Sequence, residues 1–305
     1  MTSIKKVSII GTGAIGATFA STIHDCIGDD LRIIASGERY DRYKKNGFII
    51  NGETYNFNYV KPRETVEKAD LLLIAVKYHH LDRVIKENEN HVGENTIILS
   101  LLNGINSEDI ISQYYDMSQI LFSLVFKVDA TRDGNIITHS LPGTIAFGEE
   151  KNEVYSEKVQ KVKTFFDLAG VNYEIPEDMI RKMWWKFMVN VGINQSSAVL
   201  KAPYGVFQSS EEALELLKDS MREVIILANV LGVDLEENDM QTFIDLLFNL
   251  SKDGKTSMLQ DVMAKRKTEV EMFAKVVCDL GKEHNLRLPI NDMMYKMIKV
   301  IEATY

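Results

Sequence analysis

The stretch VSIIGTGAIG, residues 7–16, is an apolar, β-rich run that ends in a G-x-G-x-x-G turn. An apolar helical pattern follows to about Ile27, and residues 31–35 have the composition of a second strand. A strand–turn–helix–strand unit of about 30 residues is the setting in which this glycine pattern binds a dinucleotide. The stretch therefore predicts that the chain begins with a dinucleotide-binding α/β domain.

The three glycines of this turn have separate expected roles. Gly11 permits the tight turn, Gly13 lets the backbone approach a pyrophosphate, and Gly16 lets helix and strand pack closely. The N–H groups at the helix start would hold the phosphates. We expect cofactor contacts along the whole turn, at Gly11, Thr12, Gly13, Ala14, Ile15 and Gly16.

The rest of the first half alternates short apolar runs with polar, helix-like segments. Runs at residues 71–76, 96–102 and 120–126 have the length and continuity of buried parallel strands. Asn51-Gly52 predicts a hairpin turn between residues 48–50 and 55–60. Two late strands are expected at residues 136–137 and 144–147. The alternation predicts a doubly wound, Rossmann-type sheet.

The character of the chain changes after about residue 175, where strand-like runs cease. Five helical segments are expected there, at residues 179–200, 211–231, 239–250, 257–284 and 291–303. The length of 305 residues also favours two domains. We predict a dinucleotide-binding Rossmann domain over residues 1–174 and an all-helical substrate and catalytic domain over residues 175–305.

Composition narrows the class of protein. The net charge of −9, without a basic stripe, argues against a nucleic-acid binder. Cys26 and Cys278 lie far apart and are expected to be reduced thiols, and the histidines show no metal-binding spacing. No apolar run approaches the roughly 20 residues that span a bilayer. These features predict a cytoplasmic enzyme with neither a metal nor a nucleic-acid or membrane partner.

The residues after the second expected strand bear on the cofactor. Enzymes that use NAD usually place an acidic residue there, against the ribose 2′-hydroxyl. This chain has Ser36, and Arg39 follows closely, which favours NADP(H) because an arginine can contact a 2′-phosphate. Glu38 leaves NAD open, since a small loop shift would make it the ribose ligand.

In the second half, Lys186, Asn190 and Asn194 are spaced i, i+4, i+8 and share one helix face among mostly apolar neighbours. The stripe fits either groups converging on a buried polar ligand or a structural polar seam. Ser257 with Gln260 predicts a capping box at a helix start. Glu269 would then lie about 120° around the same helix.

Two polar residues follow expected strands in the first half. Lys77 ends the run at residues 71–76, and Asn103 follows the run at residues 96–102. Ligands of such sheets lie at the carboxyl ends of parallel strands, so both are candidate site residues. For Lys77 the alternative is simply a charged strand end.

Together these segments resemble the ketopantoate (2-dehydropantoate) reductase family. The residues that carry the resemblance are Gly11 to Gly16, Ala75-Val76-Lys77, Leu102-Asn103-Gly104, Arg132-Asp133-Gly134, Lys186 with Asn190 and Asn194, Ser257 to Asp261, and Glu269. It implies a Rossmann domain followed by a helical domain of the 6-phosphogluconate dehydrogenase type, with the site in the cleft between them. The implied reaction is reduction of 2-dehydropantoate to (R)-pantoate by NADPH, on the route to pantothenate and coenzyme A.

The resemblance also implies residue roles. Lys186 would be the general acid, with Glu269 beside it and the cofactor. Asn103, Asn190, Asn194 and Ser257 would hold the substrate, and the cofactor would be bound by the glycine turn with Ser36, Arg39, Lys77, Asn103 and Glu269. A homodimer through the helical domain is compatible with this picture.

Two departures bear on the substrate. Gln195 stands where the family commonly has proline, and Tyr204 stands where well-known members have an asparagine. A tyrosine could reshape the pocket for a bulkier or more apolar group. The alternative enzyme is an NAD-dependent D-2-hydroxyacid dehydrogenase of the mandelate type. A non-catalytic protein that senses dinucleotides is a second alternative, which would need the glycine turn but not Lys186 or Glu269.

Overall fold

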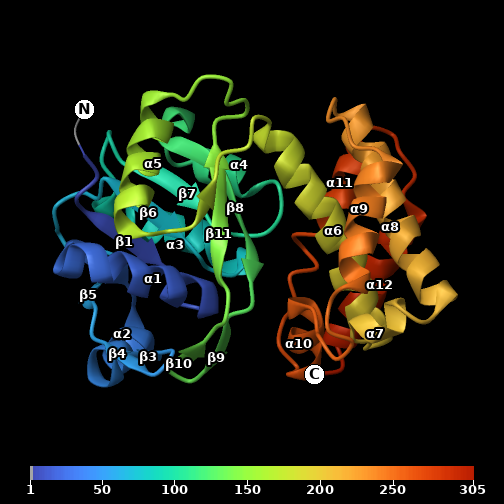
Figure 1. Ribbon diagram of the computed structural model, residues 1–305, viewed down its shortest axis with the longest axis horizontal. Coiled ribbons are helices and arrows are strands. Elements are labelled where there is room, and N and C mark those ends of the chain that lie inside the picture. Colours follow the sequence, from blue (N-terminus) through green and yellow to red (C-terminus); the bar gives the residue numbers. More distant parts are fainter. Residues whose placement is uncertain (1–2) are drawn as a thin grey trace. The chain divides into compact units, whose positions relative to one another are not determined.

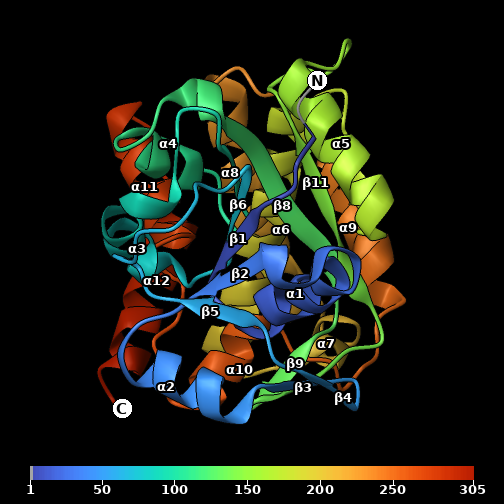
Figure 2. The same cartoon turned by 90° about the vertical axis from the view of Figure 1, so that its left-hand side faces the viewer.

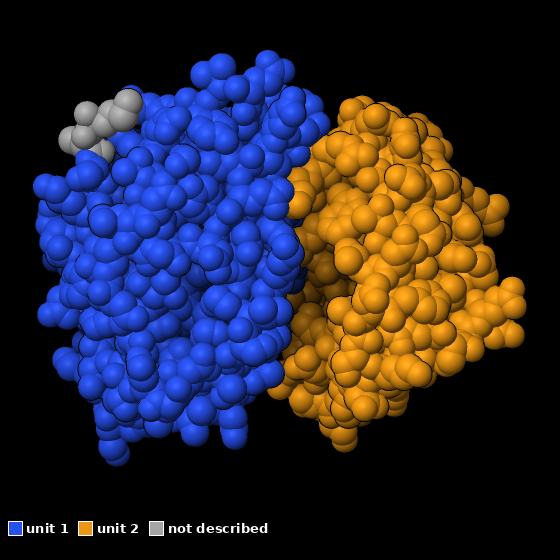
Figure 3. Space-filling view, in the orientation of Figure 1, with its two compact units in different colours: residues 1–179 blue, residues 180–305 orange. Residues whose placement is uncertain are grey.

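The computed structural model describes residues 3–305, and the chain divides into two compact units, Met1–Met179 and Ile180–Tyr305 (Figure 3). The division falls five residues beyond the boundary expected from sequence, 179 against 174. The short strand β12 (Tyr173–Glu174) still pairs with the sheet of the first unit, and Asn152 donates to the carbonyl of Pro176 at 2.8 Å. These contacts keep the connecting residues with the first unit.

The first unit is built on an eight-stranded sheet with the order β12-β11-β8-β7-β6-β1-β2-β5. Every pairing is parallel except that of β8 with β11. The strand order reverses at β1, where Val7 lies opposite Leu31 on one side and Leu71 on the other. This is the doubly wound Rossmann sheet that the sequence predicts. The remaining strands are β1 Val7–Ile10, β2 Leu31–Ile34, β5 Asn58–Val60, β6 Leu71–Ile74, β7 Ile97–Ser100, β8 Ile120–Val128 and β11 Pro142–Gly148.

Alternate residues of the central strands serve two separate cores. Val7 and Ile9 belong to the core with α1 (Ala14–Ile27) and α5 (Glu157–Ala169). Ile10 belongs to the other, with α3 (Leu81–Glu87) and α4 (Ser107–Ser112). Figure 2 shows the two helix pairs on opposite sides of the sheet. Burial on both faces explains the continuous apolar runs.

A smaller sheet, with the order β4-β3-β10-β9, carries the predicted hairpin. Asn51 and Gly52 both have positive φ, 48° and 88°, as a two-residue hairpin turn requires. The single strand expected at residues 55–60 is wrong, because β5 leaves the hairpin and pairs with β2. The elements here are α2 Gly37–Asn46, β3 Phe48–Ile50, β4 Glu53–Tyr55, β9 Thr131–Asp133 and β10 Ile136–Thr138. Short 3₁₀ turns are η1 Gly28–Asp30, η2 Tyr78–His80, η3 Glu89–His91 and η4 Met117–Gln119.

The regular elements that the structure describes in the second unit are all helices (Figure 1). Its helices are α6 Met179–Leu200, α7 Tyr204–Phe207, α8 Glu211–Val230, α9 Glu237–Phe248, α10 Ser257–Met263, α11 Ala274–Glu283 and α12 Pro289–Glu302. The long helix expected at residues 257–284 is wrong, because residues 264–273 separate α10 from α11. A Cβ on Gly192 would lie 2.5 Å from Cγ of Met221, so this glycine allows α6 and α8 to approach closely. Among residues 3–305, no helix is long and apolar enough to cross a membrane.

Candidate functional site

The glycine turn has the geometry that a dinucleotide requires. Gly11 has φ +97°, and a Cβ there would lie 2.5 Å from the carbonyl oxygen of Ala75. A Cβ on Gly16 would lie 1.9 Å from the Gly11 carbonyl oxygen, so neither position admits a side chain. At Gly13, the residue that caps α1, a Cβ would meet nothing within 4 Å. The turn is thus packed against the sheet at two glycines and open at the third, which fits a bound pyrophosphate.

Ser36 and Arg39 lie where β2 passes into α2. Ser36 is extended and precedes the helix, and its side chain makes no capping hydrogen bond. Ser36, Glu38 and Arg39 are all exposed. The helix start therefore presents a hydroxyl, a carboxylate and a guanidinium to a ribose, and its geometry leaves both Arg39 and Glu38 available.

Lys77 and Asn103 lie at the same edge of the sheet as the glycine turn. They follow β6 and β7, which are parallel neighbours with Ile74 opposite Ser100. β6 also pairs with β1, where Ile10 lies opposite Ile74. Lys77 is exposed and Asn103 half-buried. The topology therefore brings both expected residues to the carboxyl edge where α/β sheets bind ligands.

Arg132 also lies near the turn, although the sequence alone predicts no site role for it. It lies on β9, and its Nη1 donates a hydrogen bond to the carbonyl oxygen of Thr12 within the glycine turn. Its place in the Arg132-Asp133-Gly134 motif was the only signal in the sequence that could have pointed to it.

The polar stripe of the second unit forms a hydrogen-bonded network. Asn194 Nδ2 donates to Asn190 Oδ1 at 3.1 Å. Asn194 Oδ1 accepts from Ser257 Oγ at 3.2 Å and from the Met258 backbone N–H at 3.3 Å. The network joins α6 to the start of α10, so three of the expected substrate residues lie together.

One hydrogen-bond donor of this network has no acceptor among the described residues. The Nδ2 atom of Asn190 is buried and has no hydrogen-bond partner among the described residues. A buried, unpaired N–H group is costly, and in native proteins it usually has a partner such as a ligand or water. This orphaned donor favours a bound polar group over a self-contained structural seam.

Lys186 lies one helical turn before Asn190 on α6. The residue is half-buried, and burial lowers the pKa of its ammonium group to about 7, although the Glu269 carboxylate acts in the opposite direction. Glu269 is buried, with 9% of its surface exposed. A lysine that titrates near neutrality can give up a proton readily at physiological pH.

The start of α10 differs from the expected capping box. Thr256 is the N-cap residue, and its Oγ1 accepts from the Leu259 backbone N–H at 3.1 Å. Ser257 is the first helical residue, and its hydroxyl donates to Asn194 instead. The predicted cap at Ser257 is therefore wrong by one residue.

Glu269 also lies differently from the expectation. The helix from Ser257 ends at Met263, so the two residues do not share one helix. Lys265 has φ +50°, and the Arg266 N–H donates to the Asp261 carbonyl at 2.8 Å, which ends α10. Glu269 is carried by the non-helical residues 264–273, and the 120° relation is wrong.

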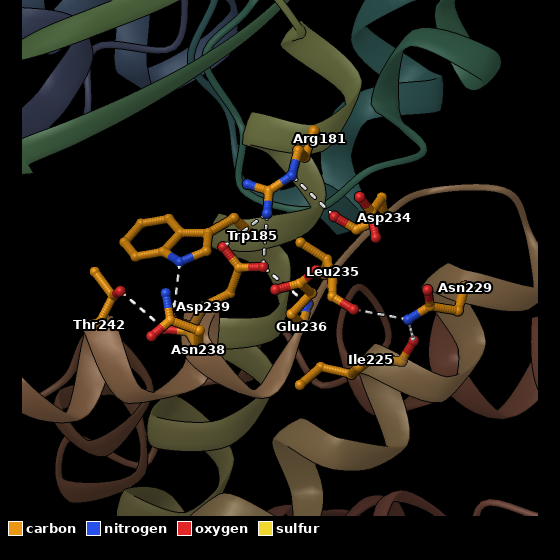
Figure 4. A network of polar contacts seen from close by, with 10 residues as sticks. All are labelled: Arg181, Trp185, Ile225, Asn229, Asp234, Leu235, Glu236, Asn238, Asp239 and Thr242. Carbon is orange, nitrogen blue, oxygen red and sulfur yellow. Dashed lines mark hydrogen bonds and ion pairs between the residues drawn. The ribbon is translucent and has the colours of Figure 1, made fainter.

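Figure 4 shows a network of polar contacts that joins α6 to α9. Arg181 Nη2 donates to both carboxylate oxygens of Asp239, at 3.0 and 2.7 Å. One turn along α6, Trp185 Nε1 donates to the Asp239 carbonyl at 3.1 Å. The Asp239 carboxylate also caps α9 by accepting from the Glu236 N–H at 2.8 Å. Because Lys186 follows Trp185 directly, this anchoring sets the direction in which α6 presents the lysine.

The two residues that depart from the family pattern differ in their surroundings. Gln195 is fully buried, and its Nε2 donates to the Val191 carbonyl at 2.9 Å and to Asn291 Oδ1 at 3.1 Å. Tyr204 begins α7, and its ring lies 2.7 Å from where a Cβ on Gly254 would be. Gln195 therefore has a structural role in the helical core, and Gly254 makes room for the tyrosine ring.

Comparison with known proteins identifies relatives over nearly the whole chain. The family described as "Ketopantoate reductase PanE/ApbA" matches residues 7–152, and its C-terminal counterpart matches residues 178–302. A 2-dehydropantoate 2-reductase of Streptococcus pyogenes serotype M3 is 26% identical over 302 residues, 97% of this chain and 98% of its own. The enzyme of that name from Pyrococcus horikoshii is 25% identical over 303 residues, 98% of each chain.

Solved structures share the fold. D-mandelate dehydrogenase with NADH and anilino(oxo)acetate has a TM-score of 0.89 at 20% identity, over 98% of this chain and 99% of that one. A PanE/ApbA family ketopantoate reductase from Ralstonia eutropha JMP134 has a TM-score of 0.87 at 20% identity, with the same coverage. A ketopantoate reductase from Staphylococcus aureus, described as dimeric, has a TM-score of 0.80 at 19% identity, over 98% and 99%.

Proposed function

Because the chain belongs to the ketopantoate reductase family, we propose that it reduces 2-dehydropantoate to (R)-pantoate with NADPH, a step towards pantothenate and coenzyme A. One observation carries the proposal beyond family membership. Asn190, Asn194 and Ser257 form a network on the helix face of Lys186, and this network retains a buried, unpaired donor. An anionic 2-oxo acid is the kind of ligand that such a network would bind.

In the proposed mechanism the chain supplies the proton and the charge stabilisation. When bound, NADPH supplies the hydride that reduces the ketone carbon. The Lys186 ammonium group stabilises the negative charge that grows on the ketone oxygen, and then transfers a proton to that oxygen to form the hydroxyl. Glu269 keeps the lysine oriented and favours its protonated form, as its effect on the Lys186 pKa indicates.

The substrate would be bound by amide and hydroxyl groups. The unpaired Nδ2 of Asn190 would donate to a substrate oxygen. Asn194 and Ser257 already contact each other, and the lone pairs and N–H groups that they do not use in that contact would bind further oxygens of the substrate. The cofactor would be bound by the turn from Gly11 to Gly16 through Thr12, Ala14 and Ile15, and by Ser36, Arg39, Lys77, Asn103 and Glu269.

The direct test is oxidation of NADPH by the purified protein in the presence of 2-dehydropantoate. The reaction is monitored by the loss of absorbance of the reduced nicotinamide. We expect turnover that saturates with the oxo acid. Cofactor binding without turnover of any 2-oxo acid would contradict the proposal and favour the non-catalytic alternative.

The cofactor preference is tested by titrating the protein with NADPH and NADH. Because Ser36 provides no carboxylate and Arg39 is exposed beside it, NADPH should bind at least about tenfold tighter. Arg39→Ala should lower that preference by about tenfold, the value of one charge-assisted contact. Lys45→Ala, at an exposed lysine in the last turn of α2, is the control and should change nothing. Equal or tighter binding of NADH by the parental protein would contradict this assignment.

A second candidate is an NAD-dependent D-2-hydroxyacid dehydrogenase of the mandelate type. The observation in its favour is Tyr204, a half-buried aromatic residue where well-known reductases have asparagine. Burial raises the pKa of its phenol. A panel of 2-oxo acids with both nicotinamides separates the two. A kcat/KM for phenylglyoxylate with NADH above that for 2-dehydropantoate with NADPH would favour this candidate.

We also propose that the chain forms a homodimer, since one relative is described as dimeric, and that the helical unit of this chain supplies the interface. Met293, Met297 and Val300 lie on α12 at i, i+4 and i+7, and are 48%, 43% and 66% exposed. An apolar stripe of this length on one helix face is suited to pack against its own copy.

A further inference from the structure

Arg132 reaches the glycine turn from a distant part of the sequence. It lies on β9, in the small sheet, 120 residues beyond Thr12. Its Nη1 donates to the Thr12 carbonyl oxygen, and its Nε donates to the Gly134 carbonyl at 2.8 Å. These two bonds orient the plane of the guanidinium and place it beside the turn.

The same guanidinium packs over aromatic rings that belong to the neighbouring elements. Its Cζ lies 5.7 Å from the ring centroid of Tyr43 on α2 and 5.5 Å from that of Phe48 on β3. Both rings are buried. Arg132 is therefore held between the glycine turn and α2 by packing as well as by hydrogen bonds.

Arg39 lies on the same side of α2. Arg39 and Tyr43 are four residues apart, so they share a helix face. Burial alone would raise the pKa of the Tyr43 phenol, but hydrogen bonding to Thr12 and the positive charges of Arg132 and Arg39 hold it below its ordinary value. Two guanidinium groups thus act on one phenol oxygen beside the glycine turn.

The adenosine ribose of a bound dinucleotide lies between the glycine turn and the end of the second strand. Arg132 borders this position from the turn, and Arg39 borders it from the helix. We infer that Arg132 is the second cation of the 2′-phosphate site and, with Arg39, determines the preference for NADP(H). The inference rests on the proposed use of NADPH. In a chain with a net charge of −9, a tetra-anionic cofactor needs such local cations.

A structural role is the alternative, in which Arg132 only ties the glycine turn to the small sheet. Two cofactor fragments separate these roles. Adenosine 2′,5′-bisphosphate carries the 2′-phosphate, and 5′-AMP lacks it, while both use the same adenosine contacts. A merely structural residue would alter the binding of both fragments equally.

The experiment measures both dissociation constants by calorimetry, for the parental protein and for Arg132→Gln and Arg132→Lys. Glutamine can still donate to the Thr12 carbonyl but carries no charge, whereas lysine keeps the charge. We expect the parental protein to prefer the bisphosphate by about a hundredfold, about tenfold for each arginine. Arg132→Gln should lower the preference to about tenfold, and Arg132→Lys should retain most of it.

Arg42→Gln is the matched control. Its Cζ also lies over the Tyr43 ring, at 5.6 Å, but no hydrogen bond joins it to the glycine turn. The preference of this variant should stay at the parental value. If Arg132→Gln does not fold, Arg39→Ala replaces it, because Arg39 is exposed. Arg39→Ala should still prefer the bisphosphate by about tenfold, the share assigned to Arg132.

Each outcome separates this inference from the proposed function. A parental protein without preference for the bisphosphate would contradict the use of NADPH itself. A parental preference that survives in folded Arg132→Gln, or that vanishes completely in Arg39→Ala, would overturn the role of Arg132. Equal weakening of both fragments in Arg132→Gln would also overturn it, in favour of the structural role.

Discussion

Lys186 is the residue on which the proposed proton transfer depends. Lys186→Ala should lower kcat by about 10²–10⁴, the usual scale of general acid catalysis. Arginine should not restore activity, because a guanidinium keeps its charge but gives up protons poorly. Glu269→Ala should lower activity without unfolding the protein, because the lysine would be less well oriented. Steady-state kinetics on variants whose folding is checked by circular dichroism provide the measurement.

The pH dependence follows from the same residue. The acid must be protonated, and the Lys186 pKa of about 7 lies below its ordinary value because of burial. The kcat/KM for reduction should therefore fall above about pH 7, and the reverse oxidation should gain over that range. Lys282→Ala, at an exposed lysine of α11, should keep the parental profile.

A folded Lys186→Ala protein within about threefold of the parental kcat would exclude Lys186 as the general acid, and Lys77 would be tested next.

Asn194 should act through substrate binding. Asn194→Ala should raise the KM for the oxo acid by about tenfold or more and leave NADPH binding nearly unchanged. Asn229→Ala is a matched control, because the Asn229 side chain donates to the backbone carbonyls of Ile225 and Leu235, both at 2.8 Å (Figure 4). The control should lower the melting temperature but not raise KM. An unchanged KM in Asn194→Ala would make Asn194 a structural residue of the helical core.

At the scale of elements, the break between α10 and α11 positions Glu269. The residue before it, Thr268, is held by Glu302 at the end of α12, which accepts from the Thr268 N–H at 2.8 Å and from its Oγ1 at 2.7 Å. Lys299 Nζ pairs with the same carboxylate at 3.1 Å. The non-helical segment is therefore secured by a helix that begins 20 residues after Glu269.

This arrangement predicts that Glu302 is a positioning residue. Glu302→Ala should lower kcat by about tenfold while KM changes little, because Glu269 would no longer be held beside Lys186. Glu302→Gln, which can still accept from Thr268, should restore most of the activity. Glu271→Gln is the control, because Glu271 also pairs with Lys299, at 3.0 Å. Equal effects of Glu302→Ala and Glu271→Gln on kcat would show that only the surface charge network matters.

At the scale of the whole molecule, the exposed stripe of α12 predicts the oligomeric state. The parental protein should sediment as a dimer, and Met297→Lys should shift it towards the monomer, because a charge would be buried in an apolar interface. Leu246→Lys is the control, at an apolar residue of α9 that is 52% exposed. A parental protein that remains monomeric at micromolar concentration would contradict the proposed dimer.

Local patterns were sufficient to predict the order of the two units and most of their elements. The glycine turn is predicted by its motif, and each buried parallel strand by the length and continuity of a short apolar run. Both signals lie within a few neighbouring residues. The predicted span of α6 agrees with the observed Met179–Leu200, because the helical pattern runs there without interruption. The hairpin at Asn51-Gly52 was predicted for a similar reason, since few residues accept positive φ at both positions.

Contacts between residues far apart in the sequence determined the features that local patterns did not predict. Thr256 and Ser257 can each cap a helix, but Thr256 takes the capping bond, while the Ser257 hydroxyl donates to Asn194, 63 residues away. The helical pattern continues past Met263, yet the chain turns at Lys265, and Thr268 beyond this turn is bound by Glu302 of α12. Arg132 meets Thr12 only because β9 folds back onto the glycine turn. The sequence by itself determined which local conformations were available, and the tertiary structure chose among them because the deciding partners lie far along the chain.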